Sequence, residues 1–124
     1  MNLFLDDIRF PENVTHVKIP KVKWHIVRNY DDFKYFIDNF GIPSVISLDH
    51  DLGIKSMEEF SKNGLNYSYD RIGNEKTGLH CLEYLLNEIE GKRLKPIDQI
   101  YIHTINPIGK QNMINLLRNK KYLF

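Results

Sequence analysis

The sequence predicts an α/β domain built on a mainly parallel sheet of four to five strands. Its short apolar runs, Leu3-Phe4-Leu5 and Val45-Ile46-Ser47-Leu48, read as strands that are buried on both faces. Helical patterns separate most of the runs, as in parallel sheets with helical crossovers. Carboxylates follow two of the runs, at Asp6-Asp7 and Asp49-His50-Asp51, where ligands of such sheets gather.

The first half of the chain contains three expected strands and one helix. Strands are expected at residues 2–5, 24–27 and 44–48, and residues 12–21 read as a loop. Asn29 is a suitable N-cap for a helix whose apolar residues follow the i, i+3, i+4, i+7 spacing. The apolar positions of this helix are Phe33, Phe36, Ile37 and Phe40, and Gly41 with Pro43 ends it.

A long polar stretch at about residues 53–76 follows the third strand, and we expect at most one short helix there, around residues 57–61. A stretch of this length without regular structure is uncommon in a compact domain and usually functional. We therefore interpret it as an insertion on the same side as the polar strand ends, acting as a lid or a binding loop.

Two helices and one strand complete the predicted fold. One helix begins at Thr77-Gly78 and ends at Gly91. A fourth strand is expected at residues 99–103. Asn106-Pro107 then begins the last helix, with a capping residue followed by proline at the first helical position. Residues 122–124 are a candidate final edge strand.

Size and composition describe one soluble domain over residues 1–124. The 124 residues are 42% hydrophobic and 27% charged, which is enough apolar surface for a core. The net charge of +1 argues against binding of duplex DNA, so an anionic ligand must be met by local groups. We expect no membrane-spanning segment. The single cysteine, Cys81, cannot form an internal disulfide, so we expect the protein in the reducing cytoplasm of the cell that makes it.

Reactive side chains follow three of the predicted strands. Because the carboxyl ends of parallel strands share one edge of the sheet, these side chains are expected to converge there: Asp6 and Asp7, then Asp49, His50 and Asp51, then His103 and Thr104. The helices that follow the strands begin at the same edge. Their free N–H groups near Thr77-Gly78 and Asn106-Pro107 are expected to attract a phosphate.

Carboxylates that converge in this way repel one another unless a hard cation lies between them. Mg²⁺ favours one or two carboxylates, with water and substrate phosphate completing its shell, and Mn²⁺ is the alternative cation. We predict that Asp6, Asp7 and Asp49 bind the metal. Asp51 is a weaker candidate, because the turn at Gly53 leaves the direction of its side chain open.

Several other polar residues have two open interpretations. Arg9 either binds phosphate or neutralises the carboxylates of its own loop. In the insertion, Tyr67, Tyr69 and Arg71 either contact a nucleotide or cover an edge of the core. Arg28 is expected to be structural or solvent-facing. Surface or packing roles are expected for the remaining histidines, His16, His25 and His80.

Four motifs in this order resemble the receiver-like domains that are proposed to process cyclic phosphates. They are Leu5-Asp6-Asp7-Ile8-Arg9-Phe10-Pro11, Ser47-Leu48-Asp49-His50-Asp51-Leu52-Gly53, Thr77-Gly78, and the segment from His103 to Met113. The resemblance covers essentially the whole chain. It implies a three-layer receiver- or flavodoxin-like fold with central strand order 2-1-3-4. It also implies a role in nucleotide or RNA-end metabolism, often in phage and bacterial conflict systems.

The chain is also similar to phospho-receivers, with informative differences. Asp6-Asp7, Asp49 and Thr104 stand where those domains have an acidic pair, a phosphoacceptor aspartate and a hydroxyl residue. The chain adds His50, Asp51 and His103, and no lysine ends a clear fifth strand. We therefore rank a phosphorylation switch last.

The leading hypothesis is a metal-dependent phosphoesterase that opens a cyclic phosphate of a nucleotide or RNA end. Asp49 would act with the metal, and His50 and His103 would share the general acid and base roles, in an order that spacing does not decide. Substrate contacts are expected from Arg9, Thr77, Gly78, Thr104, Asn106, Gly109 and Asn112. The alternative is a non-catalytic receiver-like module that binds a nucleotide or a protein partner.

Overall fold

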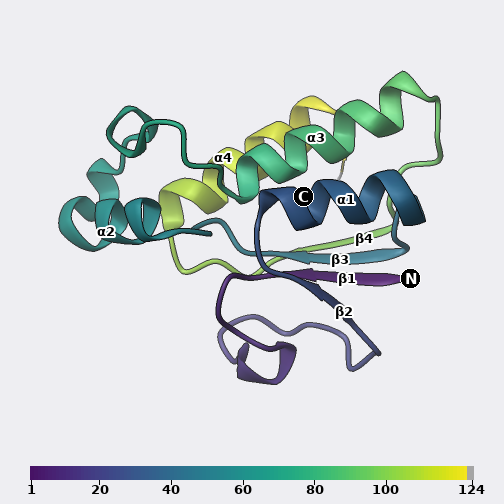
Figure 1. Cartoon of the computed structure of the whole chain (residues 1–124), viewed down its shortest axis with the longest axis horizontal. Coiled ribbons are helices and arrows are strands. Elements are labelled where there is room, and N and C mark those ends of the chain that lie inside the picture. Colours follow the sequence, from purple (N-terminus) through teal and green to yellow (C-terminus); the bar gives the residue numbers. More distant parts are fainter. Residues whose placement is uncertain (123–124) are drawn as a thin grey trace.

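The computed structural model describes residues 1–122, and its sheet contains four parallel strands within that range. The strands are β1 (Asn2–Leu5), β2 (His25–Val27), β3 (Val45–Leu48) and β4 (Gln99–Ile102), in the order β2-β1-β3-β4 (Figure 1). The predicted receiver- or flavodoxin-like α/β class and the strand order 2-1-3-4 are confirmed. The candidate edge strand at residues 122–124 falls on residues 123–124, which lie outside the described residues.

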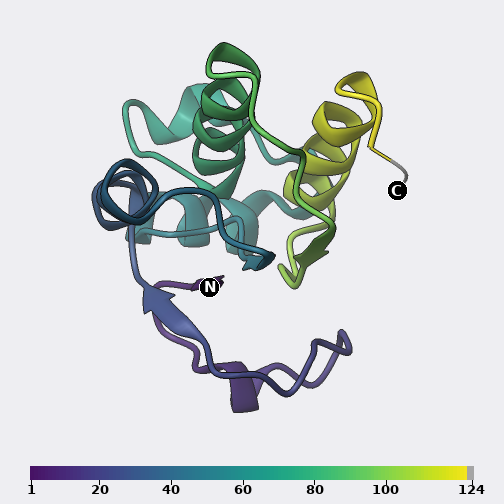
Figure 2. The same cartoon turned by 90° about the vertical axis from the view of Figure 1, so that its right-hand side faces the viewer.

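Three helices lie on one face of the sheet, namely α1 (Tyr30–Phe40), α3 (Gly78–Gly91) and α4 (Pro107–Asn119) (Figure 2). The crossovers from β2 to β3 and from β3 to β4 run in the same direction across the sheet, so right-handed connections place α1 and α3 on the same face. The core lies between these helices and Leu3, Leu5, Ile46 and Leu48 of the sheet. Within residues 1–122, no helix has the length and apolar character needed to cross a bilayer.

The predicted cap of α1 is present, but the last residue of its predicted apolar series is exposed. Asn29 Oδ1 accepts the N–H of Asp32 at 2.8 Å. Phe33, Phe36 and Ile37 of the predicted series are buried, whereas its last residue, Phe40, is 53% exposed. The Phe40 ring lies beside the rings of Phe36 and His25, at the edge of the sheet where no further described strand follows β2.

The opposite face of the sheet is covered by the connection between β1 and β2, residues 6–24. Within the described residues no α-helix lies on this face, and the connection contains one short 3₁₀ turn, η1 (Pro11–Asn13) (Figure 2). Phe4 points to this side and contacts the edge of the Trp24 ring. A groove of about 760 Å³ lies between the connection and β2. The third layer of the fold is therefore a loop.

The segment at residues 53–76 is more regular than the sequence predicted. The helix α2 (Ile54–Asn63) has ten residues, and the 3₁₀ turns η2 (Gly64–Asn66) and η3 (Tyr69–Ile72) follow it. Glu75 supplies its N-terminal cap, because its carboxylate accepts the N–H groups of Lys55 and Ser56 at 3.2 and 2.6 Å. A Cβ at Gly53 would lie 2.4 Å from this carboxylate. The cap comes from far along the chain, so the helix lacks a local start signal.

Candidate active site

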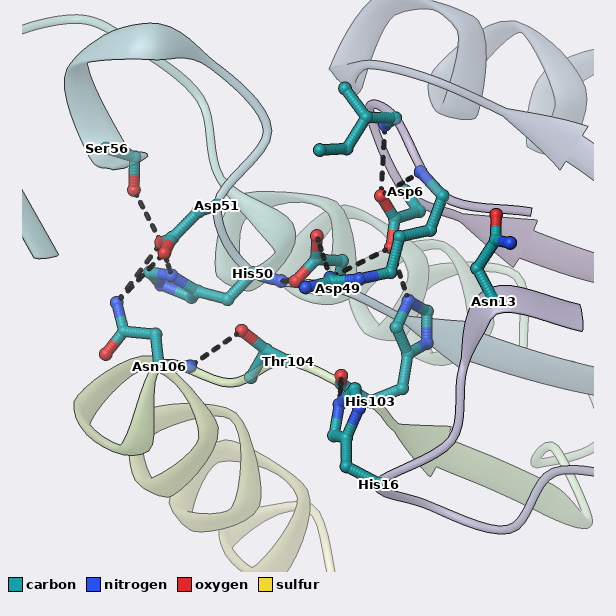
Figure 3. A network of polar contacts seen from close by, with 12 residues as sticks. Asp6, Asn13, His16, Asp49, His50, Asp51, Ser56, His103, Thr104 and Asn106 are labelled. Carbon is teal, nitrogen blue, oxygen red and sulfur yellow. Dashed lines mark hydrogen bonds and ion pairs between the residues drawn. The ribbon is translucent and has the colours of Figure 1, made fainter. Parts of the chain in front are cut away.

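The residues that directly follow β1, β3 and β4 meet at the carboxyl edge of the sheet (Figure 3). These residues are Asp6, Asp49 and His103, all buried, and one ligand atom from each lies within 4.8 Å of the others. The aligned strand register brings them together, and the N–H groups of Asp49 and His103 extend the ladder by bonding to Leu5 and Leu48 carbonyls at 2.9 Å. We call these three residues the Asp-His cluster.

The His103 ring is held on every side. Its Nδ1 lies 2.7 Å from Ser47 Oγ, its Nε2 lies 3.0 Å from Asp6 Oδ2, and its face stacks on Phe4 at a centroid distance of 4.7 Å. Burial lowers the pKa of His103, against the opposing effect of the Asp6 carboxylate. The neutral ring therefore donates from Nε2 to Asp6 and accepts the Ser47 hydroxyl at Nδ1.

The two carboxylates of the Asp-His cluster have pKa values shifted in opposite directions. Burial acts to raise the pKa of Asp6, but hydrogen bonds from His103 and from the backbone N–H groups of Arg9 and Ile8 outweigh it, so the pKa is lowered. Burial and the negative charge of Asp6 raise the pKa of Asp49 to about 7. Paired carboxylates that are pushed apart in this way are typical of functional sites.

Arg9 lies across the two carboxylates of the Asp-His cluster. Its Nη1 is 3.5 Å from Asp6 Oδ2 and 3.8 Å from Asp49 Oδ2, and its side chain is partly exposed. In the absence of a ligand Arg9 therefore neutralises these carboxylates, and its predicted contact with a phosphate stays a prediction. The guanidinium also stands between the groups that were predicted to hold a metal, so Arg9 and a metal ion would compete for them.

A second buried network lies next to the Asp-His cluster and is centred on Asp51 (Figure 3). Asp51 Oδ1 lies 2.7 Å from His50 Nδ1, and it accepts from Ser56 Oγ at 2.7 Å and from Asn106 Nδ2 at 3.1 Å. Protein groups therefore surround this oxygen. Among the described residues, Asp7 and Asp51 lie outside the Asp-His cluster, which differs from the predicted ligand set by containing His103.

The His50 imidazole is fully buried, and both of its nitrogens are hydrogen-bonded within the protein. Nδ1 lies 2.7 Å from the Asp51 carboxylate, and Nε2 lies 2.8 Å from the hydroxyl of Tyr69. Asn112 Nδ2 donates to the same hydroxyl at 3.1 Å. A Cβ at Gly109 would lie 2.3 Å from the ring, so α4 can approach only through a glycine. In this arrangement His50 does not face the solvent.

The start of α3 is closed by contacts within the protein. Gly78 N–H donates to the His50 carbonyl at 2.7 Å, and Thr77 N–H donates to His80 Nδ1 at 2.9 Å. A Cβ at Gly78 would lie 1.8 Å from the Asp49 carbonyl oxygen. A buried helix start must satisfy its first N–H groups internally. The Gly78 N–H, which we expected to bind phosphate, instead holds the His50 carbonyl, and the Thr77 N–H is used by His80.

The start of α4 is closed in a similar way. Asn106 Oδ1 accepts the N–H groups of Ile108 and Gly109, each at 3.1 Å. Thr104 Oγ1 accepts the N–H of Asn106 at 3.2 Å, and the same hydroxyl hydrogen-bonds to the Asp49 carboxylate. Thr104 is thus, with Arg9, a predicted substrate residue that contacts a carboxylate of the Asp-His cluster.

Three residues with a clear part in the site were not predicted as site residues. Ser47 was missed although it is the one polar residue in the strand sequence VISL, and a buried hydroxyl needs a partner. Ser56 left no local signal, since its hydroxyl pairs with Tyr67 at 2.6 Å and with Asp51. Arg28 is structural, because its guanidinium donates to the Asp6 carbonyl at 3.1 Å and lies 4.6 Å from the centre of the Phe10 ring.

A pocket of about 130 Å³ opens beside the Asp-His cluster. Its lining comes from four segments of the chain and combines charged side chains with apolar ones and one serine: Asp7, Arg9, Asp49 and Asp51, then Ile8, Met57, Phe60 and Ile105, and Ser61. The partly exposed carboxylate of Asp7 lies on this pocket, and burial together with Asp6 raises its pKa. A ligand in this pocket would therefore meet Arg9, three carboxylates and several apolar side chains.

The fold and this strand-edge site define a receiver-type domain, and the family model named cyclic-phosphate processing receiver domain matches residues 1–119. The chain belongs to this family, so the resemblance noted in the sequence is confirmed. Searches of curated proteins and of solved structures found no match.

The donors of the Asp-His cluster fit a divalent cation. A cation about 2.1 Å from each ligand brings its ligand atoms within about 4.2 Å of one another, so the observed 4.8 Å limit requires only a small contraction. Two carboxylates with one imidazole suit Mn²⁺ as well as Mg²⁺, which prefers oxygen. Binding would replace the contacts of Arg9 and would move the His103 proton to Nδ1, facing Ser47 Oγ.

Proposed function

We propose that the protein is a metal-dependent phosphoesterase that opens a cyclic phosphate of a nucleotide or RNA end. The observation that supports this most is the buried Asp-His cluster at the carboxyl edge of the sheet, next to a pocket that contains a cationic side chain. Membership in the cyclic-phosphate processing family supports the substrate class. A purely structural role explains the Asp-His cluster less well than a functional one, because two carboxylates buried side by side destabilise a fold.

Asp6, Asp49 and His103 would hold Mg²⁺ or Mn²⁺, which supplies polarisation of a phosphoryl oxygen and orientation of the attacking water. Arg9 then pairs with the oxygens of the phosphate, for which a guanidinium is well suited. His50 fixes the end of β3 through Asp51 and Tyr69, and so positions Asp49. Asp7 lies on the pocket with a raised pKa and is suited to exchange a proton with the leaving oxygen.

A second candidate function is binding without chemistry. The position of Arg9 favours it, because the guanidinium neutralises Asp6 and Asp49 without a cation. Such a module would bind the cyclic phosphate tightly and release it unchanged. This outcome is distinguished from catalysis by looking for product.

Turnover tests the proposal. Purified protein with Mg²⁺ or Mn²⁺ is incubated with cyclic mononucleotides, cyclic dinucleotides, RNA 2′,3′-cyclic ends and ADP-ribose cyclic phosphate, and the products are analysed by mass spectrometry. We expect one class to be opened. Asp49→Asn and His103→Ala should lower the rate at least 100-fold, as loss of a metal ligand or acid-base group does.

The matched control is Asp98→Asn, a change of an exposed carboxylate before β4, which should leave the rate unchanged. Full activity in both cluster variants would contradict the assigned roles. A folded protein that opens no member of the panel would contradict catalysis, and tight binding without product would then support the second candidate.

A further inference from the structure

Four apolar side chains surround the pocket beside the Asp-His cluster, although they come from three separate segments. Ile8 follows β1, Met57 and Phe60 belong to α2, and Ile105 precedes α4. Ile8, Ile105 and Met57 are 63%, 55% and 38% exposed. We call these four residues the apolar wall. Exposed apolar side chains that converge on a concave site are typical of a ligand-binding surface.

The helix α2 brings half of the apolar wall to the site. Figure 1 shows α2 beyond the carboxyl ends of the strands, away from the layer formed by α1, α3 and α4. The Glu75 cap and the Ser56 hydrogen bond to Asp51 hold the first turn of α2 against the end of β3. The contacts that hold Met57 and Phe60 in place are therefore made to the end of β3, next to the Asp-His cluster.

The dimensions of the pocket limit what the apolar wall can bind. Its volume of about 130 Å³ is well below the roughly 300–1,000 Å³ that encloses a drug-sized ligand, so a ligand that contacts this lining stays partly exposed to solvent. Phe60 contributes an aromatic ring to the lining, and base–aromatic stacking accepts any base. The same lining contains Arg9 and Asp49, which suit a phosphate with its cation. A flat heteroaromatic ring attached to a phosphate matches both the apolar and the charged residues.

Resting on the proposed function, we propose that the apolar wall binds the nucleobase of the substrate, while the cyclic phosphate lies beside Arg9 and Asp49. The substrate class is then a nucleoside cyclic phosphate whose own base is recognised by apolar contact. Cyclic phosphates of sugars without a base belong outside that class. The wall contributes affinity and does not take part in the chemical step.

Affinity measured without turnover tests the wall independently of catalysis. Isothermal titration calorimetry of the full chain in EDTA compares adenosine 2′,3′-cyclic phosphate with ribose 2,3-cyclic phosphate, which lacks the base. We expect the base to tighten binding about tenfold or more, because stacking of one base is worth about that much. Ile105→Ala should weaken binding of the adenosine ligand about threefold to tenfold and leave binding of the ribose ligand unchanged.

The matched control is Ile54→Ala, the same substitution at a 73% exposed residue of α2 that does not line this pocket. It should leave both affinities unchanged, and circular dichroism should show both variants folded. Equal affinities for the two ligands, equal weakening of both by Ile105→Ala, or no binding of either would overturn the apolar wall. A base preference without turnover in Mn²⁺ keeps the wall and contradicts the phosphoesterase, whereas turnover without a base preference does the reverse.

Discussion

Asp49 has a buried carboxylate beside the ionised carboxylate of Asp6, and this makes its ionisation costly. Its pKa rises from 3.8 to about 7, so between these values the folded protein binds a proton that the unfolded chain has released. Stability therefore falls as the pH rises from about 4 through 7, because the unfolded state binds fewer protons there. A cation in the site would remove this cost by neutralising the charge.

Asp49→Asn is expected to stabilise the metal-free protein at high pH. The amide has no charge to bury, so we expect the variant to melt several degrees above the wild type at pH 8. At about pH 4 the two proteins should melt at nearly the same temperature. Thermal melts followed by circular dichroism in EDTA measure the difference, and an equal offset at both pH values would contradict the raised pKa.

His50 and His103 show why residue type alone does not define a role. Both were predicted as acid and base, and both are fully buried with two hydrogen-bonded nitrogens. His103 belongs to the Asp-His cluster, whereas His50 lies outside it and hydrogen-bonds to Asp51 and Tyr69. The acid-base assignment itself stays a prediction, and the pocket adds Asp7 as a group that faces a ligand.

The contact between α4 and the end of β3 depends on a glycine. In α4, Gly109 lies against the His50 ring, and an added Cβ would overlap it at 2.3 Å. The helix start is anchored there by Asn106, which also donates to Asp51. A small displacement of α4 is therefore transmitted to the residues that position Asp49.

Gly109→Ala is expected to destabilise the fold by about 1–3 kcal/mol, because an extra methyl group in a tight contact forces the helix or the ring to move. It should also lower turnover, or ligand affinity if the protein is a binding module. Gly91→Ala is the matched control, since a Cβ there meets nothing within 4 Å in the structure. That variant should be neutral or slightly stabilised, as helical alanine is preferred to glycine. Urea unfolding compares the two, and equal stability of both variants would show that the Gly109 contact is relaxed.

The helices with local caps were predictable, whereas only the middle of α2, around residues 57–61, was expected to be helical. Asn29 and Asn106 stand directly before α1 and α4, where the side chain meets the first N–H groups. The cap of α2 is Glu75, which is 20 positions from Lys55. A cap this distant cannot be predicted from the residues that neighbour the helix start. Residues 53–76 therefore appeared irregular although they contain a ten-residue helix.

At the scale of the whole molecule, the candidate site is fixed from both faces of the sheet. On the helix face, α3 and α4 hold the backbone and ring of His50. On the loop face, Arg28 donates to the Asp6 carbonyl, and His16 hydrogen-bonds to the His103 carbonyl. The Asp-His cluster thus joins β1, β3 and β4 with the connection at residues 6–24. A ligand bound to the cluster should stabilise the fold as a unit.

Mn²⁺ is expected to stabilise the wild type by about 2.7 kcal/mol when its concentration is 100 times its dissociation constant. The melting temperature should rise accordingly. Arg9→Ala should show a larger shift at the same Mn²⁺ concentration, since the competing guanidinium is gone, and an ion pair of this kind is worth up to about 1 kcal/mol. Asp49→Asn should show almost none. Differential scanning fluorimetry measures all three, and Arg93→Ala, an exposed arginine, is the control. Equal shifts in all four proteins would place Mn²⁺ elsewhere.

The sequence alone predicted the strands, the helices with adjacent caps and the family. It also predicted the edge of the sheet that carries Asp6, Asp49 and His103. Each depends on neighbouring residues or on the rule that parallel strands end together. The tertiary structure alone decided which polar groups remain for a ligand. Arg9 lies across two carboxylates, Ser47 holds His103, and the N–H groups of α3 and α4 are used internally. The reason is burial, which obliges each donor and acceptor to find a partner, and those partners are distant in sequence.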